Sequence, residues 1–274
     1  MKPNMFKTRC QSNLPYPGSR FIMVASATTV LLCVWAFPIA ANYIPPQDAS
    51  APRPGRTATG GIRGGGCSAS ATTGLVPLAP QNHLGQTTST QPTFAWFNPE
   101  RESYLTEFRV AEYVPNDRFQ VVYQTEFEST EALLPSGISM LSMSETETYL
   151  SAGKTYRWQV VLVCDPNRPS ESLVINVDFT VTDAPSSLTT SLSSATTASD
   201  RFVLYGEAGF WYDAFDEALE ASANDPEAQL VLLTDLAANA ENSDDSNSES
   251  TTEDTDGDRL RQVIDIITGN ITGE

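Results

Sequence analysis

Apolar and polar residues alternate with a period of two along the middle of the chain. The clearest examples, between residues 92 and 181, are the segments PTFAWF, RFQVVYQTEF, GKTYRWQVVLVC and LVINVDFTV. Alternation that is rich in β-branched and aromatic residues is typical of strands that bury one face. The segments YLTEFRVAEY and GISMLSM fit two further strands, with turn-forming residues between them. This pattern predicts an antiparallel β-sandwich over residues 67–182.

Two of these segments make the expected sandwich more specific. In RFQVVYQTEF the alternation places five residues on one face, which we expect to be buried: Phe119, Val121, Tyr123, Thr125 and Phe127. In GKTYRWQVVLVC the inward face carries Trp158, and the opposite face carries Arg157 and Gln159. Leu150 precedes Tyr156 by six residues, a spacing that resembles the tyrosine corner of fibronectin type III and immunoglobulin-like domains.

After residue 200 the apolar residues recur with a helical period instead. The recurrence runs from Phe202 to Leu219, stops at the sequence NDP at 224–226, and then continues with regularly spaced leucines. A proline at a helix start, after an interruption, indicates a second helix. We therefore predict a helical hairpin over residues 201–240, which resembles a single tetratricopeptide-type unit. The expected fold class is mainly β, an immunoglobulin- or fibronectin-III-like sandwich followed by this short α-helical hairpin.

A single helical hairpin leaves an apolar face uncovered, since such repeats need about three copies to be stable. We therefore expect this hairpin to dock on the sandwich, on a partner or on another copy of itself. Trp211, Tyr212 and Phe215 are the residues that we expect to bind a partner. The alternative for these aromatic residues is that they fill the space between the two helices.

Four segments flank the predicted sandwich and hairpin. Residues 42–66 are rich in Pro, Gly and Arg, and residues 183–200 are rich in Ser and Thr, so both are predicted to be flexible linkers. Residues 241–258 are acidic and poor in apolar residues, which predicts disorder. Residues 259–274 place apolar residues on one helical stripe, which predicts a short amphipathic helix and a tail.

The first 41 residues have the layout of a signal peptide, with four positive residues, an apolar run and small residues at its end. The alternative is a retained membrane anchor, because the apolar run comes close to the length that spans a bilayer. Removing the leader changes the formal charge from −18 to −22, since four Lys and Arg residues leave and no acidic residue leaves with them. We expect an exported protein, periplasmic or extracellular, with no membrane contact after cleavage and no nucleic-acid partner.

The cysteines point to the same compartment. Cys10 and Cys33 lie in the predicted leader, so the processed chain retains Cys67 and Cys164. An even pair in an exported chain indicates a disulfide in an oxidising compartment. The alternative is two free thiols.

Few residues are arranged for catalysis or metal binding. The single histidine, His83, stands in a loop composition without a nucleophile motif nearby, so we interpret it as a surface residue. The sequence DTDGD at 254–258 resembles the start of a calcium loop but lacks the first and last carboxylates of that motif. The glycine-rich run before Cys67 lacks the Gly-Lys ending of a phosphate loop. We therefore predict no catalytic residue, cofactor or metal, and a carboxylate pair is the alternative that an enzyme would need.

Five separated segments resemble one protein family in their residues and in their order along the chain. They are RGGGC at 63–67, LVP at 75–77, TT with QPTFAWF at 87–97, GKTYRWQVVLVCDP at 153–166 and LYGEAGFWYDAF at 204–215. Over residues 60–237 the chain resembles the cyanobacterial exported proteins grouped as domain of unknown function 928 (DUF928). The resemblance implies an exported protein with a β-rich part and a helical segment. It implies no established activity and no catalytic residues.

These observations lead to three functional hypotheses. The first is a non-enzymatic protein-interaction module of the cell envelope, in which the sandwich presents loops and the hairpin recruits another envelope or exported protein. The second is a carbohydrate-binding or envelope-associated module, in which exposed Trp or Tyr residues stack on sugars. The third is a glycan hydrolase that uses a pair of carboxylates.

Overall fold

The structure is a computed structural model of the chain. It describes residues 43–46, 67, 73–116, 118–133, 137–222, 227–244 and 255–272. All of these residues belong to one compact unit, Ile39–Glu274. The predicted leader, residues 1–41, and nearly all of the predicted linker 42–66 lie outside the described residues, so both stay predictions.

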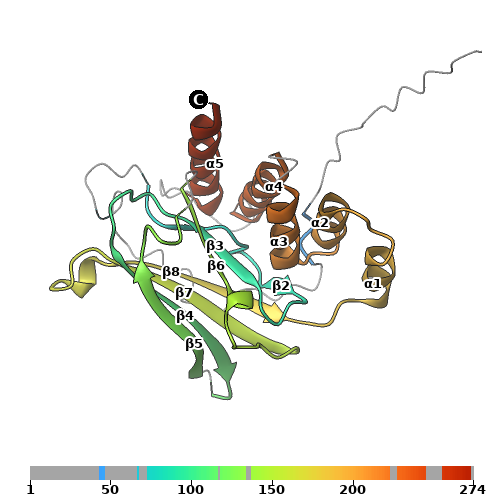
Figure 1. Cartoon of the computed structure of the whole chain (residues 1–274), viewed down its shortest axis with the longest axis horizontal. Helices are drawn as coiled ribbons and strands as arrows, with labels where there is room; N and C mark the ends of the chain where they lie inside the picture. The colour runs from blue at the N-terminus through green and yellow to red at the C-terminus, as the bar shows by residue number, and fades with distance from the viewer. Residues whose placement is uncertain are drawn as a thin grey trace, which may run out of the picture. The chain divides into compact units, whose positions relative to one another are not determined.

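Two β-sheets form in the described part of the chain (Figure 1). The larger sheet has the order β2-β8-β7-β4-β5, with bounds Gly85–Thr87, Leu173–Val181, Lys154–Val163, Leu105–Val114 and Arg118–Glu128. The smaller sheet has the order β1-β3-β6, with bounds Val76–Pro77, Thr93–Phe97 and Ile138–Ser142. Two short 3₁₀ helices, Met143–Glu145 and Pro169–Glu171, lie in the loops. Every pairing is antiparallel except that of β2 with β8. The six segments with period-two alternation all form strands as predicted.

Five α-helices follow the strands among the residues that the structure describes. They are α1 (Ser186–Leu192), α2 (Ala198–Glu207), α3 (Trp211–Ala221), α4 (Glu227–Asp244) and α5 (Asp256–Thr272). Together they contain more residues than the strands do, so the described fold is mixed α and β. The expectation of a mainly β protein is therefore wrong. Contacts of α3 with β2 and β3, and of α5 with β1, attach the helices to the sheets.

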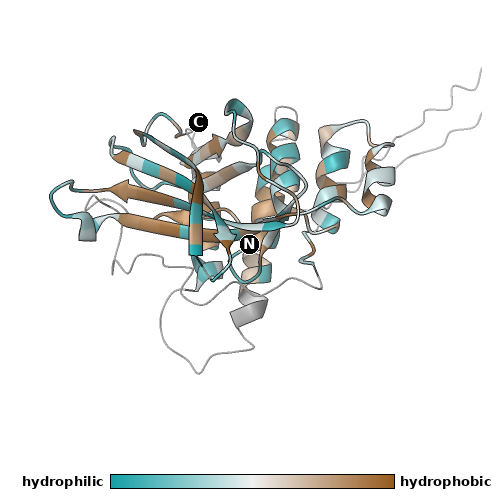
Figure 2. Cartoon of the chain, turned by 90° about the horizontal axis from the view of Figure 1, so that it is seen from below, coloured by the Kyte–Doolittle hydropathy of each residue, from teal (hydrophilic) through white to brown (hydrophobic). Residues whose placement is uncertain are grey.

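Aromatic residues fill the space between the two sheets. Phe94 of β3 lies 5.4 Å from Phe108, 5.6 Å from Trp158 and 5.3 Å from Phe179, measured between ring centroids. These four side chains are fully buried. Hydrophobic residues are prominent along the strands in Figure 2 and on one side of the helices. The burial of such large side chains is the main favourable term for this part of the fold.

Strand β5 departs from its predicted alternation at Val122. Tyr123 pairs with Val110, but Val121 pairs with the next residue of β4, so Val122 is an extra residue that makes a β-bulge. One extra residue reverses the faces of all residues before it. Phe119 and Val121 are consequently 46% and 52% exposed, whereas Tyr123 packs against the core. The prediction that all five alternating residues share one buried face is wrong for these two.

The predicted helical hairpin contains three helices, because its first helix is divided at Gly209. Gly209 has a φ of 83°, a left-handed conformation that suits glycine. The N–H of Gly209 donates to the carbonyl of Gly206, and the N–H of Phe210 donates to that of Tyr205. This pair of hydrogen bonds is a Schellman motif, which ends α2 and lets α3 begin in a new direction.

The Ser/Thr-rich segment 183–200 also differs from its prediction as a flexible linker. It contains α1, whose Leu188 is buried, and the first turn of α2. Thr197 and Asp200 form a capping box at the start of α2, in which each side chain bonds the other residue's backbone N–H. Thr197 thus acts as a helix-capping residue, a role that the abundance of Ser and Thr in this segment does not reveal.

The acidic segment 241–258 is helical at both ends, because α4 extends to Asp244 and α5 begins at Asp256. Residues 245–254 lie outside the described residues, so the predicted disorder is not tested there. The amphipathic helix predicted near the end of the chain is confirmed as α5, with its stripe buried at Leu260, Val263 and Ile267. These residues belong to the same core as the sheets.

Candidate functional site

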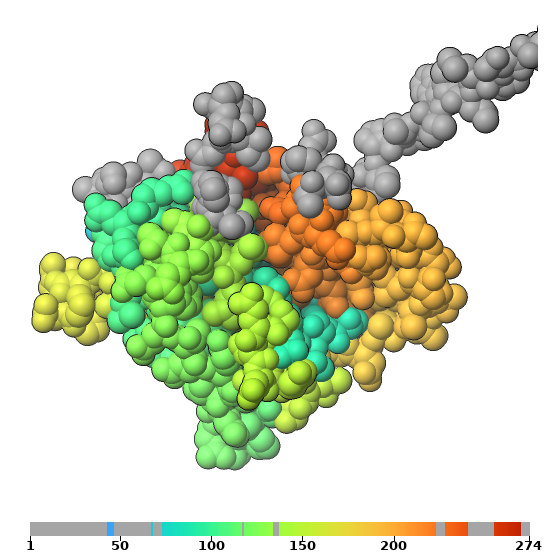
Figure 3. Space-filling view, viewed as in Figure 1, coloured from blue at the N-terminus to red at the C-terminus, as the bar shows by residue number. Residues whose placement is uncertain are grey.

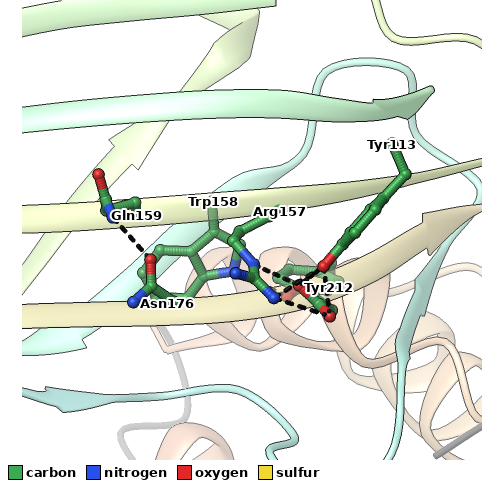
Figure 4. A network of polar contacts seen from close by, with 7 residues as sticks. Tyr113, Arg157, Trp158, Gln159, Asn176 and Tyr212 are labelled. Atoms are coloured by element: carbon green, nitrogen blue, oxygen red, sulfur yellow. Dashed lines mark hydrogen bonds and ion pairs between the residues drawn. The ribbon is translucent and has the colours of Figure 1, made fainter. Parts of the chain in front are cut away.

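The three aromatic residues expected to bind a partner lie inside the protein. Trp211, Tyr212 and Phe215 of α3 are each at most 2% exposed. The indole N–H of Trp211 donates to the carbonyl of Leu78 at 3.0 Å, and the hydroxyl of Tyr212 accepts from the indole N–H of Trp158 at 3.0 Å (Figure 4). The partner-binding interpretation of these residues is therefore corrected. They dock α3 on the strands of their own chain.

The predicted disulfide between Cys67 and Cys164 is confirmed, with a Cα–Cα distance of 5.1 Å. Cys164 follows β7 directly, so the bond ties residue 67 to the end of a central strand. It closes a loop of 97 residues. The pair is a structural link and leaves neither thiol available for chemistry.

The single histidine is also placed differently from its prediction. His83 is 7% exposed, and its ring nitrogens contact the hydroxyl of Tyr43 and the side chain of Asn82. Burial lowers the pKa of His83 to about 4. The interpretation as a surface loop residue is therefore wrong.

Two carboxylates of α3, Asp213 and Asp216, are the strongest candidates for the pair that a hydrolase would need. Burial raises the pKa of both side chains, and for Asp216 the value reaches about 6. Asp213 accepts hydrogen bonds from the backbone N–H and the hydroxyl of Thr88. For Asp216, the neighbouring Thr93 opposes this rise and lowers the pKa in part. Asp213 therefore fastens α3 to the loop between β2 and β3, whereas Asp216 lies beside the first residue of β3.

The outer face of the five-stranded sheet, opposite the aromatic core, carries a connected polar and aromatic cluster. Arg157 of β7 forms an ion pair with Asp178 of β8, with 2.7 Å between Nε and Oδ1. The hydroxyl of Tyr113 donates to both carboxylate oxygens of Asp178 at 3.0 Å and accepts from Arg157 Nη2 at 2.7 Å. The Arg157 guanidinium also lies 4.8 Å from the ring centroid of Phe119. We call Tyr113, Phe119, Arg157 and Asp178 the outer cluster; Tyr113 and Arg157 are labelled in Figure 4.

The outer cluster is buried at its ion pair and exposed at its aromatic edge. The side chain of Asp178 is 1% exposed and that of Arg157 is 16% exposed. The ring of Phe119 packs against that of Tyr113 with 4.4 Å between centroids and 49° between planes, yet Phe119 remains 46% exposed. Val121, the next residue on this face of β5, is 52% exposed. A buried ion pair thus holds an exposed aromatic and aliphatic edge in a fixed place.

The elements that build the outer cluster are neighbouring strands of one sheet. Arg157 pairs directly with Asp178 across β7 and β8, and Tyr113 pairs with Phe119 across β4 and β5. Gln159 donates to Asn176 at 2.7 Å and extends the polar row along the same face. In Figure 3 the green β4–β5 hairpin lies at the molecular surface. Strand β5 forms one edge of the sheet.

The sequence identifies only part of this cluster. The alternation in β7 correctly puts Arg157 and Gln159 on the face opposite Trp158. Phe119 was predicted on the wrong face, because the bulge at Val122 has no signal in the alternating pattern. The alternation in β8 places Asp178 on the outer face. Its role as the ion-pair partner of Arg157 follows only from the pairing of β7 with β8.

Metal-ligand groups, membrane-spanning helices and surface hollows are the other features that could indicate a site in the part of the chain that the structure describes. Groups of three or more His, Cys, Asp or Glu side chains suited to a metal ion are absent from these residues. Among the same residues, none of the helices is both long and apolar enough to span a membrane. A shallow hollow beside α1 is lined by Ser and Thr side chains, including Ser186 and Thr190.

The described part of the chain is a mixed α/β fold with one disulfide between Cys67 and Cys164. A family model described as Domain of Unknown Function (DUF928) matches residues 58–236, and the chain belongs to that family. The membership in DUF928 that the five sequence segments indicate is therefore confirmed. No curated protein and no solved structure matches the chain.

Proposed function

We propose that this protein is an exported, non-enzymatic binding protein of the cell envelope that engages a partner protein through its outer cluster. The observation that carries the proposal is the exposed pair Phe119 and Val121 beside the anchored Arg157. Arg and aromatic residues are enriched among the side chains that dominate binding energy in protein interfaces. A preorganised surface also loses less conformational entropy when a partner binds.

Export is supported by the disulfide and by the composition of the first 41 residues. Disulfides persist in oxidising compartments such as the periplasm and the extracellular space. The positive residues and apolar run at the start of the chain have the layout of a leader. The strong negative charge of the chain favours a partner whose contact surface is neutral or basic.

A binding role without catalysis is supported by the state of the groups that an enzyme would use. His83 is enclosed by Tyr43 and Asn82, and both cysteines of the described chain are bonded to each other. Asp213 accepts hydrogen bonds from the backbone N–H and hydroxyl of Thr88, and Asp216 is buried beside Thr93 of the same chain. A glycan hydrolase that used this pair would first have to break those hydrogen bonds.

Carbohydrate binding is the second candidate, and Tyr149 favours it. Tyr149 is 69% exposed in the loop that precedes β7, and an exposed aromatic ring can stack on the apolar face of a sugar. The described tryptophans are all buried, so we assign sugar stacking to Tyr149, which is more exposed than Phe119. The two candidates use different aromatic residues and can be separated by substitution.

The test compares two variants of the full exported chain. Phe119→Ser with Val121→Ser removes the exposed edge of the outer cluster, and Tyr149→Ser removes the exposed loop aromatic. Proteins co-purified from the native envelope are quantified for each variant, and binding to a glycan array is measured in parallel. The proposal expects a partner that is retained by Tyr149→Ser and lost with the double variant. Glycan binding that is lost only with Tyr149→Ser would favour the second candidate.

A further inference from the structure

Residues 43–46 are held against the helices by bonds to both sides of the Tyr43 backbone. The N–H of Tyr43 donates to Asp235 Oδ2 at 3.0 Å, and its carbonyl accepts from Asn239 Nδ2 at 3.0 Å. Both partners lie on α4. The N–H of Ile44 donates to the carbonyl of Gly206 of α2 at 3.1 Å. This short segment therefore bridges two helices that are distant from it in sequence.

The side chain of Tyr43 is also held in place, by contacts with Trp211 and His83. It is 3% exposed, and its ring meets that of Trp211 edge to face at 5.0 Å between centroids. Its hydroxyl lies 2.8 Å from His83 Nε2. His83 Nδ1 lies 2.6 Å from Asn82 Oδ1, which assigns the proton to Nδ1 and leaves Nε2 to accept from Tyr43. Burial lowers the pKa of His83, so the ring is neutral at neutral pH and suits this arrangement.

The last residue of the segment, Pro46, packs closely against Gly209. A Cβ atom at Gly209 would come within 2.7 Å of Pro46 Cγ and 3.1 Å of the Ile44 carbonyl oxygen. Gly209 is therefore needed for the close approach of the segment as well as for its positive φ. We call residues 43–46, with these contacts, the N-terminal strap.

From these contacts we infer that the N-terminal strap sets the boundary at which proteolytic processing of the chain stops. The inference rests on the proposed export, in which an endopeptidase removes the leader. Peptidases bind their substrates as extended chains through backbone N–H and C=O groups. In the strap these groups of Tyr43 are already bonded to α4, and the residue is buried. A peptidase can therefore act on the bonds of the strap only after the strap has opened.

The processing step is an ordinary hydrolysis that occurs before Tyr43. Water adds across a peptide bond upstream of Tyr43, the carbon–nitrogen bond breaks, and the new ends are a carboxylate on the released leader and an ammonium on the retained chain. An ammonium close to Tyr43 would also be attracted to Asp235, whose carboxylate holds the Tyr43 N–H. Processing and docking of the strap thus support each other.

The test is intact-mass analysis and N-terminal sequencing of the full protein recovered from the exporting cell, followed by digestion with an aminopeptidase. The inference expects chains that begin at or before Tyr43 and resist trimming beyond it. Asn239→Ala removes one hydrogen bond of the strap, and trimming past Tyr43 should accelerate roughly fivefold. Asp265→Ala, at an exposed position of α5, is the matched control and should trim like the wild type.

The outcomes separate this inference from the proposed export. Wild-type chains that begin after Tyr43, or trimming that Asn239→Ala leaves unchanged, would overturn the strap as a processing boundary. A chain that still begins at Met1 would contradict the proposed export and leader removal. Endopeptidase digestion of that full-length chain still tests the strap, because cuts within residues 43–46 of the folded protein would overturn it as well. The far-ultraviolet circular dichroism of each variant verifies that it is folded.

Discussion

Replacing Arg157 with methionine tests whether the outer cluster is anchored by its ion pair. Methionine keeps most of the aliphatic length of arginine and removes the guanidinium. Asp178, whose side chain is 1% exposed, would then be a buried carboxylate without its cation. Breaking a buried ion pair by removing one partner costs about 3–5 kcal/mol. The hydroxyl of Tyr113 still donates to Asp178, so we expect the lower end of this range.

The loss of the contact between Arg157 and Phe119 adds a smaller amount. A cation over an aromatic ring at a partly exposed site contributes about 0.5–1 kcal/mol. We therefore expect Arg157→Met to lower the free energy of unfolding by about 3–4 kcal/mol. Domains of ordinary stability have about 5–15 kcal/mol in total, so this change would be conspicuous.

The assay is guanidinium chloride unfolding followed by tryptophan fluorescence, with three accompanying variants, of which the first is Asp178→Asn alone. Asp178→Asn together with Arg157→Met removes both charges, and the double variant should lose less stability than the sum of the single variants. Arg109→Met is the matched control, because Arg109 lies on the same face and pairs with Glu107 while its side chain is 38% exposed. Its cost should stay within about 1 kcal/mol. Additive losses, or an Arg157→Met cost as small as that of the control, would refute the anchoring role.

Three further predictions concern the fold that carries the cluster. Replacing Cys67 and Cys164 with serine should lower the free energy of unfolding by about 2–5 kcal/mol, and non-reducing peptide mapping of the wild type should recover the linked pair. Tyr212→Phe leaves the buried indole N–H of Trp158 without its acceptor and should cost about 1–3 kcal/mol in thermal or chemical unfolding. Burial raises the pKa of Asp216 to about 6, above its value in the unfolded chain. The folded protein therefore holds this proton more tightly than the unfolded chain does. This contribution to the free energy of unfolding is present at low pH and is lost as pH rises from about 4 to 6. Asp216→Asn should flatten this part of the stability profile, and a profile identical to that of the wild type would contradict the raised pKa.

The strands and the disulfide follow from local features of the sequence. The period-two alternation of β7 and β8 is visible in each segment alone, because a buried sheet face selects apolar residues at every second position. The pairing of Cys67 with Cys164 follows from counting the cysteines that a leader would leave behind. Neither inference needs information about the distant parts of the chain.

The remaining features depend on contacts between distant residues. The indole N–H of Trp211 donates to the carbonyl of Leu78, 133 positions earlier in the chain. An amphipathic pattern shows that a helix has an apolar face, but it does not show whether that face packs on the same chain or on a partner. The strap depends on Tyr43 meeting Asp235 across 192 positions. The outer cluster required the bulge at Val122, whose single extra residue changes which side chains are exposed. Burial of a polar or aromatic residue is decided by these long-range contacts.

The central claim, that the outer cluster binds a partner, can be tested most directly by photo-crosslinking in the exporting cell. A benzoylphenylalanine residue is introduced at position 119, on the outer face of β5, or at position 149, in the exposed loop before β7. If the outer cluster binds a partner, we expect a discrete crosslinked protein from position 119 and none from position 149. Crosslinking from position 149 alone, or the absence of any crosslink from position 119 in a folded and exported chain, would contradict it.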